Sequence, residues 1–204
     1  MARETSTGNY YTVAKSYSGA TALSASMWIY YSTDSDGTMA AIWEDAGSVY
    51  QWLFAKNASN QLGAIIYDSN SRVAVGGTMT KNAWQHIAFT FSSSDLVRAF
   101  VNGSEVATAA VGGVGLATHS ASFGIGARQA GNLPFAGRVA EMATWTVRLT
   151  AAQIASLSKG FAPPKVLKPD FYAPIIRETI DVTNKYAFTT VGTPTIESHP
   201  RIYK

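Results

Sequence analysis

Short runs of β-type residues recur along almost the whole chain and are separated by turn-forming residues. In the run LSASMWIYY, every second residue from Leu23 to Tyr31 is apolar and belongs to one strand face, while Trp28 and Tyr30 fall on the other. Further strands are expected at 40–43, 49–54, 62–67, 72–75, 84–91, 97–101, 105–109, 122–127 and 138–145. Strands of this length and spacing are typical of an all-β sandwich.

The sharpest turn signal is Asn102-Gly103, which lies between the predicted strands 97–101 and 105–109. A type I′ hairpin turn needs positive φ at both central residues, and Asn and Gly tolerate that conformation best. We therefore expect a tight hairpin here, with its strand register fixed by the turn. The other glycine-rich links lack the helix and the Lys-Ser/Thr pair of a phosphate-binding loop.

One short helix is signalled at about residues 149–160. Thr150 and Gln153 have the spacing of a capping box, and Gly160 suits a left-handed helix end. One apolar stripe would be formed by Ile154, Leu157 and Phe161. The helix is therefore expected to lie against the sandwich.

The composition changes after this helix, because six of the seven prolines lie from Pro163 onward. The segment APPKVLKP favours an extended path, and 170–182 and 186–196 again resemble short strands around a Thr183-Asn184 turn. We therefore expect a sandwich core at 1–161. The Pro-rich segment and C-terminal strands of 162–204 would complete that sandwich or dock on a neighbouring subunit.

Composition and charge exclude several classes of protein. The chain of 204 residues has 47% hydrophobic residues, which suits one domain, and it has no cysteine for disulfides or thiolate metal sites. The formal charge of +3 arises in residues 159–204, without the clustered Lys and Arg of a nucleic-acid interface. No apolar run approaches the ~20 residues of a membrane helix, and no export signal is expected.

In their order, these motifs resemble a laminin-G-like domain of the concanavalin A-like lectin/glucanase jelly roll. The matching pieces are ALSASMWIYY, AWQHIAFTF, AFVNGSEV, FGIGAR, FAGRVAEMATW and LTAAQIASLSKGF. The resemblance implies an all-β jelly-roll β-sandwich. Its structural signature would consist of Trp28, Trp84, His86, Asn102, Gly103, Gly137, Glu141 and Trp145.

The C-terminal segment has a narrower resemblance, to laminin-G-like proteins of tailed bacteriophages. The pieces that carry it are KGFAPP, LKPDFYAPIIRE, TVGTPT and HPR. In commoner members of the broad family, a segment like FYAPIIRE precedes the first core strand, whereas here it follows the helix. We therefore hypothesise a circularly permuted sandwich, in which residues 170–196 supply strands that would normally come first.

The candidate catalytic residues lack the neighbouring groups that catalysis would need. His86 shares a strand face with Trp84 and has no nucleophile or second metal ligand at a suitable spacing, so a structural histidine is favoured. A retaining glycosidase needs two carboxyl groups about 5 Å apart, but Glu141 is the lone acid of its strand and the E-x-D-x-x-E pattern is absent. Hydrolase activity is therefore not expected, and no catalytic or cofactor-binding residue is assigned.

Two weaker binding sites remain open. Asp34 and Asp36 in STDSDGT could contribute to a calcium site, but such a site needs six to eight oxygens, so a solvated loop is favoured. Aromatic side chains could contact a glycan or a subunit. The candidates are Tyr10, Tyr11, Tyr50 and Trp52, with Tyr17 and Tyr30 in the same part of the chain.

The resemblance implies a non-enzymatic phage virion protein, made in the host cytoplasm. It would be a capsid decoration or cement protein, or a head or tail fibre component. Its partners would be other virion proteins and further copies of itself, with no nucleic acid and no membrane. The alternative is a glycan-binding adhesion module that recognises a surface glycan.

Overall fold

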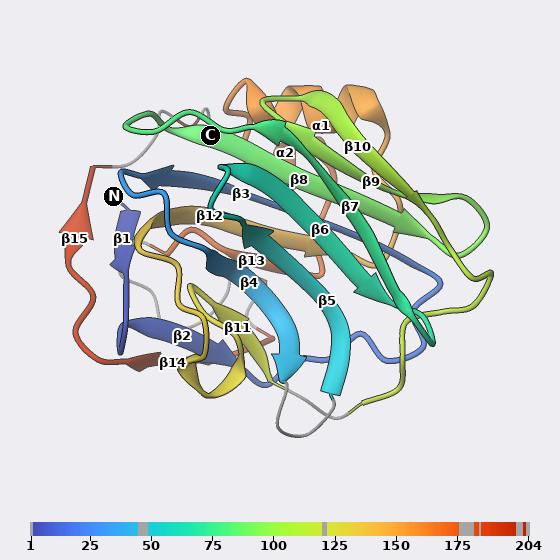
Figure 1. The fold of residues 1–204 in the computed structure, drawn as a ribbon, viewed down its shortest axis with the longest axis horizontal. Helices are drawn as coiled ribbons and strands as arrows, with labels where there is room; N and C mark the ends of the chain where they lie inside the picture. The colour runs from blue at the N-terminus through green and yellow to red at the C-terminus, as the bar shows by residue number, and fades with distance from the viewer. Residues whose placement is uncertain are drawn as a thin grey trace.

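The computed structural model describes residues 2–44, 49–119, 122–175, 182–183, 185–198 and 202. Two antiparallel sheets pack face to face (Figure 1). The first sheet has the order β10 (Ser104–Ala110), β9 (Leu96–Val101), β8 (Gln85–Ser92), β3 (Ala22–Tyr31), β12 (Gly137–Trp145), β1 (Ala2–Thr5), β15 (Ile196–Glu197), and β13 (Phe171–Ala173) also pairs with β12. The second has the order β14 (Phe188–Val191), β2 (Tyr10–Val13), β11 (Phe123–Ile125), β4 (Gly37–Glu44), β5 (Val49–Lys56), β6 (Gln61–Tyr67), β7 (Ser71–Thr78). The predicted all-β jelly-roll sandwich is confirmed.

The core lies between the two sheets and follows the period of two in the sequence. In β3, the residues from Leu23 to Tyr31 at alternate positions are fully buried. From the opposite sheet, Trp52 and Phe54 pack against Phe89 of β8, with ring centroids 5.6 and 5.0 Å from it. Each such side chain contributes roughly 1.5–3 kcal/mol by burial, so these rings fix how the sheets face each other.

The predicted hairpin forms where expected. Asn102 and Gly103 have φ angles of 49° and 84°, as a type I′ turn requires. The Asn102 side chain also accepts a hydrogen bond from the backbone N–H of His86 at 2.9 Å. The turn therefore ties β8 to the hairpin of β9 and β10.

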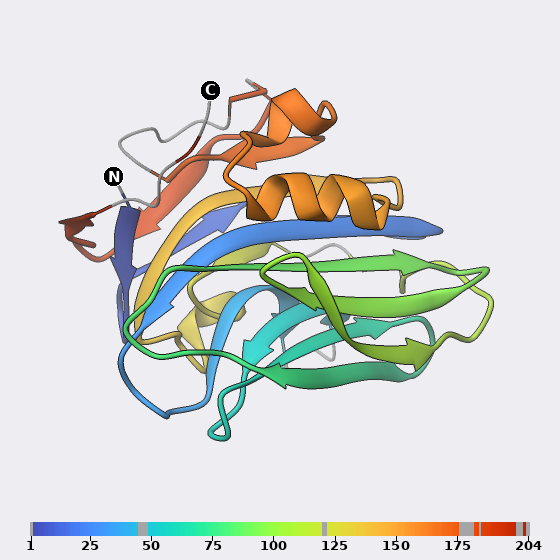
Figure 2. The same ribbon diagram turned by 90° about the horizontal axis from the view of Figure 1, so that it is seen from above.

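A helical layer covers the outer face of the eight-stranded sheet, as Figure 2 shows. Helix α1 (Ala151–Ser158) has the predicted capping box between Thr150 and Gln153. Its buried residues Ile154 and Leu157 pack in one cluster with Phe100, and other members of that cluster are Ala88, Ala143, Trp145, Leu149 and Tyr172. Of the predicted stripe, Phe161 is exposed, because the chain turns at Gly160 and carries it past the helix.

The C-terminal segment adds strands to both sheets. Strand β13 pairs with β12, β14 with β2, and β15 with β1. Phe171 and Phe188 enter the main core. The extended path expected for APPKVLKP is wrong in part, since α2 (Pro163–Val166) makes one helical turn with proline at its start, where its missing N–H costs nothing.

Strands β1 and β2 at the N-terminus were not predicted from the sequence. They are short, and they become strands through pairing with β12, β11 and the C-terminal strands. The circular permutation stays a prediction. Within the described residues, no helix is long and apolar enough to cross a membrane.

Candidate functional site

Three aromatic side chains gather on the outer face of the seven-stranded sheet, and we call them the front aromatic cluster. They are Trp43 of β4, Tyr50 of β5 and Tyr67 of β6. The ring of Tyr50 lies 4.6 Å from that of Trp43 and 5.3 Å from that of Tyr67, measured between centroids. Trp43 is 9% exposed, whereas the two tyrosines are half-buried and present part of their rings to solvent.

A β-bulge creates this cluster. Ile42 of β4 pairs with Trp52, but the next residue, Trp43, pairs with Tyr50. Gln51 is therefore the extra residue on β5, and the bulge brings the rings of Trp43 and Tyr50 side by side on one face. Without this irregularity, Trp43 would stand opposite Gln51.

The displaced Gln51 is fully buried and holds the adjoining loop in place. Its Nε2 donates to Ser16 Oγ at 2.9 Å, to Ser18 Oγ at 3.0 Å and to the carbonyl oxygen of His119 at 3.0 Å. Its Oε1 accepts from the backbone N–H of Tyr17 at 3.0 Å. Because the buried amide of Gln51 has hydrogen-bond partners for both its nitrogen and its oxygen, these bonds stabilise the bulge.

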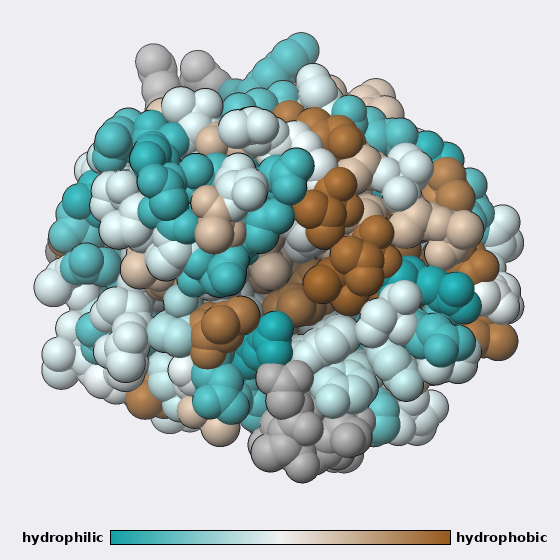
Figure 3. Space-filling view, viewed as in Figure 1, coloured by the Kyte–Doolittle hydropathy of each residue, from teal (hydrophilic) through white to brown (hydrophobic). Residues whose placement is uncertain are grey.

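An apolar floor extends from the aromatic cluster across β5, β6 and β7. Leu53 pairs with Ile65, and Ile65 pairs with Val73, so the three side chains form one row over the outer face. Val73 and Val75 are 48% and 43% exposed. Figure 3 shows hydrophobic side chains gathered across the middle of this face. An exposed apolar row beside half-buried rings is a feature of binding surfaces.

Polar groups border the cluster on its other side. The guanidinium carbon of Arg128 lies 6.0 Å from the centroid of the Trp43 ring. Arg128 precedes the turn η1 (Gln129–Gly131), which contacts β4. In this turn Ala130 has a φ of 60°, and Leu133 just beyond it has 46°, both in a region that costs side-chain-bearing residues energy. A guanidinium therefore lies next to Trp43, directly before this strained turn.

Of the four aromatic residues predicted as glycan or subunit contacts, Tyr50 belongs to this cluster. Trp52 is fully buried in the core and Tyr11 is 3% exposed, so neither ring is available at the surface. Burial raises the pKa of Tyr11 to about 12. Tyr10 is half-buried and lies against Gly131, where a Cβ would come within 2.8 Å of its ring.

His86 lies in the wall between the sheet and its covering layer. It is 1% exposed, and its ring packs edge-on against Trp28 at 5.5 Å. Burial lowers the pKa of His86 to about 3, so the imidazole is neutral at physiological pH. Neither ring nitrogen has a hydrogen-bond partner within the described part of the chain. Among those residues, no acid or nucleophile is therefore hydrogen-bonded to this imidazole.

Glu141 is 5% exposed and accepts a hydrogen bond from the hydroxyl group of Tyr172. Its φ is 55°, at the point where the register of β12 against β3 shifts. The small hollow beside it is lined by His86 and Trp28, and Glu141 is the acid among the described residues that line it. The carboxylate therefore joins the C-terminal strand β13 to the sheet.

The remaining signature residues form the outer face and the packing of the eight-stranded sheet. Tyr30 lies 5.9 Å from Trp84, with the Arg138 guanidinium 4.8 Å above the tyrosine ring. A Cβ at Gly137 would come within 2.5 Å of the carbonyl oxygen of Tyr30. Trp145 is buried and donates from Nε1 to the carbonyl oxygen of Leu167 at 2.9 Å.

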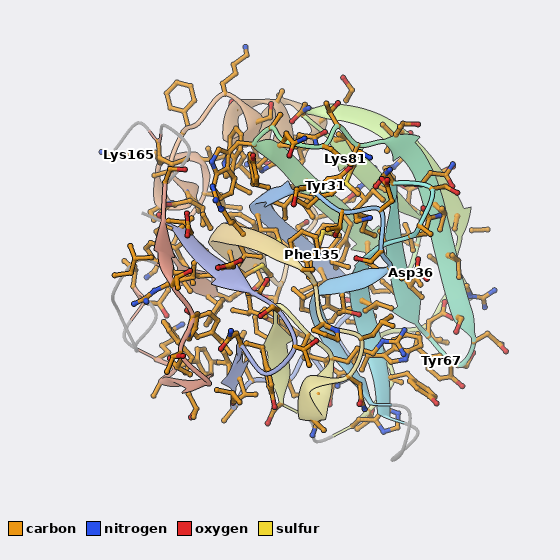
Figure 4. The ribbon with its side chains drawn as sticks, turned by 60° about the vertical axis from the view of Figure 1, so that its left-hand side comes forward. Tyr31, Asp36, Tyr67, Lys81, Phe135 and Lys165 are labelled. Atoms are coloured by element: carbon orange, nitrogen blue, oxygen red, sulfur yellow. The ribbon has the colours of Figure 1, made fainter. Side chains whose placement is uncertain are left out.

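The calcium candidates lie on an exposed loop, on which Figure 4 labels Asp36. Asp34 accepts hydrogen bonds from Lys81 Nζ and from Asn60 Nδ2, both at 2.6 Å. The hydrogen bond from Lys81, followed by that from Asn60, holds the pKa of Asp34 below its usual value. Asp36 is exposed on the same loop. In the described ranges, no three acidic or histidine side chains converge as metal ligands would.

The comparisons with known proteins agree with the fold. A family model described as the concanavalin A-like lectin/glucanases superfamily matches residues 5–155. No curated protein matches the sequence. A predicted carbohydrate-binding protein from Bacteroides ovatus superimposes with a TM-score of 0.69 at 16% identity, over 98% of this chain and 60% of that one.

Two further solved structures share the sandwich. A heptameric SAP-like pentraxin from Limulus polyphemus has a TM-score of 0.59 at 14% identity, over 74% of this chain and 75% of that one. The binding domain of botulinum neurotoxin serotype D has a TM-score of 0.62 at 14% identity, over 78% and 41%. The chain therefore spans less than two thirds of the Bacteroides protein and of the toxin domain.

Proposed function

Since this chain belongs to the concanavalin A-like lectin/glucanase superfamily, we propose that it is a carbohydrate-binding module whose binding site is the front aromatic cluster. The observation that carries the proposal is the placement of the half-buried rings of Tyr50 and Tyr67 beside Trp43 on an open sheet face. Flat aromatic faces suit the C–H faces of sugar rings, because both surfaces are apolar and broad.

Arg128 and the residue that follows it could supply the hydrogen bonds that a sugar needs besides stacking. The Arg128 guanidinium is a planar donor next to Trp43, and Gln129 follows it in the strained turn. A guanidinium donates hydrogen bonds to hydroxyl groups in fixed directions, and an amide both donates and accepts, which selects among sugars. The apolar row through Leu53, Ile65 and Val73 would extend the contact along a chain of sugar units.

Two of the similar solved structures support the proposal, because their names refer to binding. The Bacteroides ovatus protein is a predicted carbohydrate-binding protein, and the binding domain of botulinum neurotoxin DC was solved in complex with SialylT. At 16% and 13% identity these likenesses establish the fold alone. The site assignment therefore rests on the side chains of this chain.

The test is a glycan-array screen, followed by calorimetry on the best glycan. Replacing Tyr50 or Tyr67 with alanine is expected to weaken binding about tenfold each, by removing one stacking ring. Tyr30→Ala is the matched control, since it removes a half-buried ring from the outer face of the other sheet. Binding that survives both cluster variants but not Tyr30→Ala would move the site to the opposite sheet.

The proposal includes no hydrolytic step. Among the described residues, Glu141 is the acid that lines the hollow beside His86, and its carboxylate accepts a hydrogen bond from the Tyr172 hydroxyl group. Retaining glycosidases need a second carboxyl group about 5 Å away. Release of reducing sugar from a bound polysaccharide would refute the assignment as a binding module.

The virion role stays a prediction that rests on the phage-like C-terminal segment. It would make the chain a capsid decoration protein or fibre component, with virion proteins and further copies of itself as partners. Electron microscopy of purified particles with averaging tests it. Regular density on capsids or fibres would support that role, and particles that lack the protein would exclude it.

A further inference from the structure

A hollow of about 440 Å³ lies where helix α1 begins, over the outer face of the eight-stranded sheet. Its floor is formed by Thr90 of β8, with Arg98 of β9 beside it. The opposite wall is formed by residues 148–150 and by Ala151, the first residue of α1. Helix α1 lies on the outer side of the eight-stranded sheet (Figure 2), whereas the front aromatic cluster lies on strands of the seven-stranded sheet, so the hollow and the cluster are separate.

Two buried donors in this hollow have no acceptor in the described part of the chain. Thr90 is 1% exposed, and its Oγ1 has no hydrogen-bond partner there. The same holds for Nε of Arg98, a buried N–H of a charged group. Leaving such a group unpaired costs about 1–3 kcal/mol. The presence of two of them in one hollow therefore points to a ligand that accepts hydrogen bonds.

The start of α1 adds further donors. The capping box of Thr150 and Gln153 satisfies one backbone N–H of the first turn, that of Gln153. The N–H groups of Ala151 and Ala152 precede the first intrahelical hydrogen bond, and Ala151 lines the hollow. The positive end of the helix dipole therefore faces the same space as the unpaired side-chain donors.

One carboxylate, that of Glu105, lines the hollow, but it and the nearby Asp95 accept hydrogen bonds from the terminal nitrogens of Arg98. Arg98 donates from its two terminal nitrogens to Glu105 at 3.0 Å and to Asp95 at 3.2 Å. Asp95 also pairs with Arg148. These four charges cancel, so the hollow selects a ligand through directed donors rather than through net charge.

We infer that this hollow is a binding site for an oxyanion group, a carboxylate or a sulfate, on a ligand no larger than a monosaccharide. The Thr90 hydroxyl and the Arg98 Nε–H would donate to its oxygens, and the first turn of α1 would face its charge. Oxyanions accept several hydrogen bonds at once, which matches the unpaired donors of Thr90 and Arg98 together with the first turn of α1.

In the experiment, the intact protein is titrated with sodium sulfate, glucuronate or glucose. Binding is measured by calorimetry and by the NMR chemical shifts of the backbone amides of residues 90, 98, 151 and 152. Sulfate and glucuronate are expected to bind saturably and to shift these amides, while glucose does neither. Binding of both anions identifies a general oxyanion site, and binding of glucuronate alone identifies an anionic-sugar site. Absence of saturable binding by either anion would overturn the inference.

The decisive variant is Thr90→Val, which keeps the side-chain shape and removes the unpaired hydroxyl. It is expected to weaken anion binding about tenfold or more, because a hydrogen bond to a charged acceptor is lost. Its melting temperature without anion should not fall, since no described residue loses a partner. Thr12→Val, in a strand of the other sheet, is the matched control. Anion affinity unchanged in Thr90→Val would refute the site.

Discussion

The burial of His86 predicts a specific loss of stability in acid. The folded protein holds the imidazole at a pKa of about 3, against 6.5 for an ordinary histidine, and burial is the cause. Between these values the unfolded chain binds a proton that the folded protein does not. Stability from this residue is therefore complete above pH 6.5 and is lost as pH falls towards 3.

The magnitude follows from the shift. Each pH unit within the window costs about 1.4 kcal/mol, so the loss from His86 at pH 4.5, two units below 6.5, is about 3 kcal/mol. His86→Phe removes the titration and keeps a ring against Trp28, whose centroid lies 5.5 Å away. His119 and His199 are present in both proteins, so their contributions cancel in the difference.

The assay is urea unfolding of the wild-type protein and His86→Phe at pH 7.5 and pH 4.5. Relative to the wild type, the variant should gain about 3 kcal/mol in its free energy of unfolding between pH 7.5 and pH 4.5. The chemical shifts of the His86 ring should report a neutral imidazole in the folded protein at pH 5. Parallel loss of stability in the two proteins, or protonation of folded His86 near pH 6, would refute the reasoning.

Three further outcomes are expected. Gly103→Ala should lower the free energy of unfolding by at least about 1–3 kcal/mol, since its Cβ would lie 2.5 Å from Ser158 Oγ at a φ of 84°, and thermal unfolding measures this. Thr150→Ala should cost about 1 kcal/mol by removing the cap of α1, and a Thr150→Ser variant that loses as much would contradict that cause. Deleting residues 162–204 should abolish cooperative unfolding, because Phe171 leaves the core, whereas a folded truncated chain would show that the core is independent.

The sequence predicted the sheets well because each strand carries its own signal. The period of two located the strand with Met27, and Asn102-Gly103 located the hairpin, since both depend on residues that are close in the chain. The capping box of Thr150 placed α1 within two residues. Strands β1 and β2 depend on distant partners for their pairing, and local patterns therefore missed them.

The candidate site was only partly predictable, because it depends on strand register. Tyr50 and Trp52 are two residues apart, so regular alternation would put them on one face. The bulge at Gln51 instead turns Tyr50 outward and leaves Trp52 in the core. Trp43 and Tyr67 were missed because no local signal shows which strands become neighbours. An aromatic residue in each of three successive strands was the available clue.

The most direct test of the carbohydrate-binding proposal is calorimetry of the best array glycan with the Tyr50→Ala/Tyr67→Ala double variant and the wild-type protein. Binding by the wild type and loss of roughly a hundredfold in affinity in the folded double variant are the results expected from two lost stacking rings. Equal affinity of the two proteins, or no glycan bound by the wild type, would contradict the account.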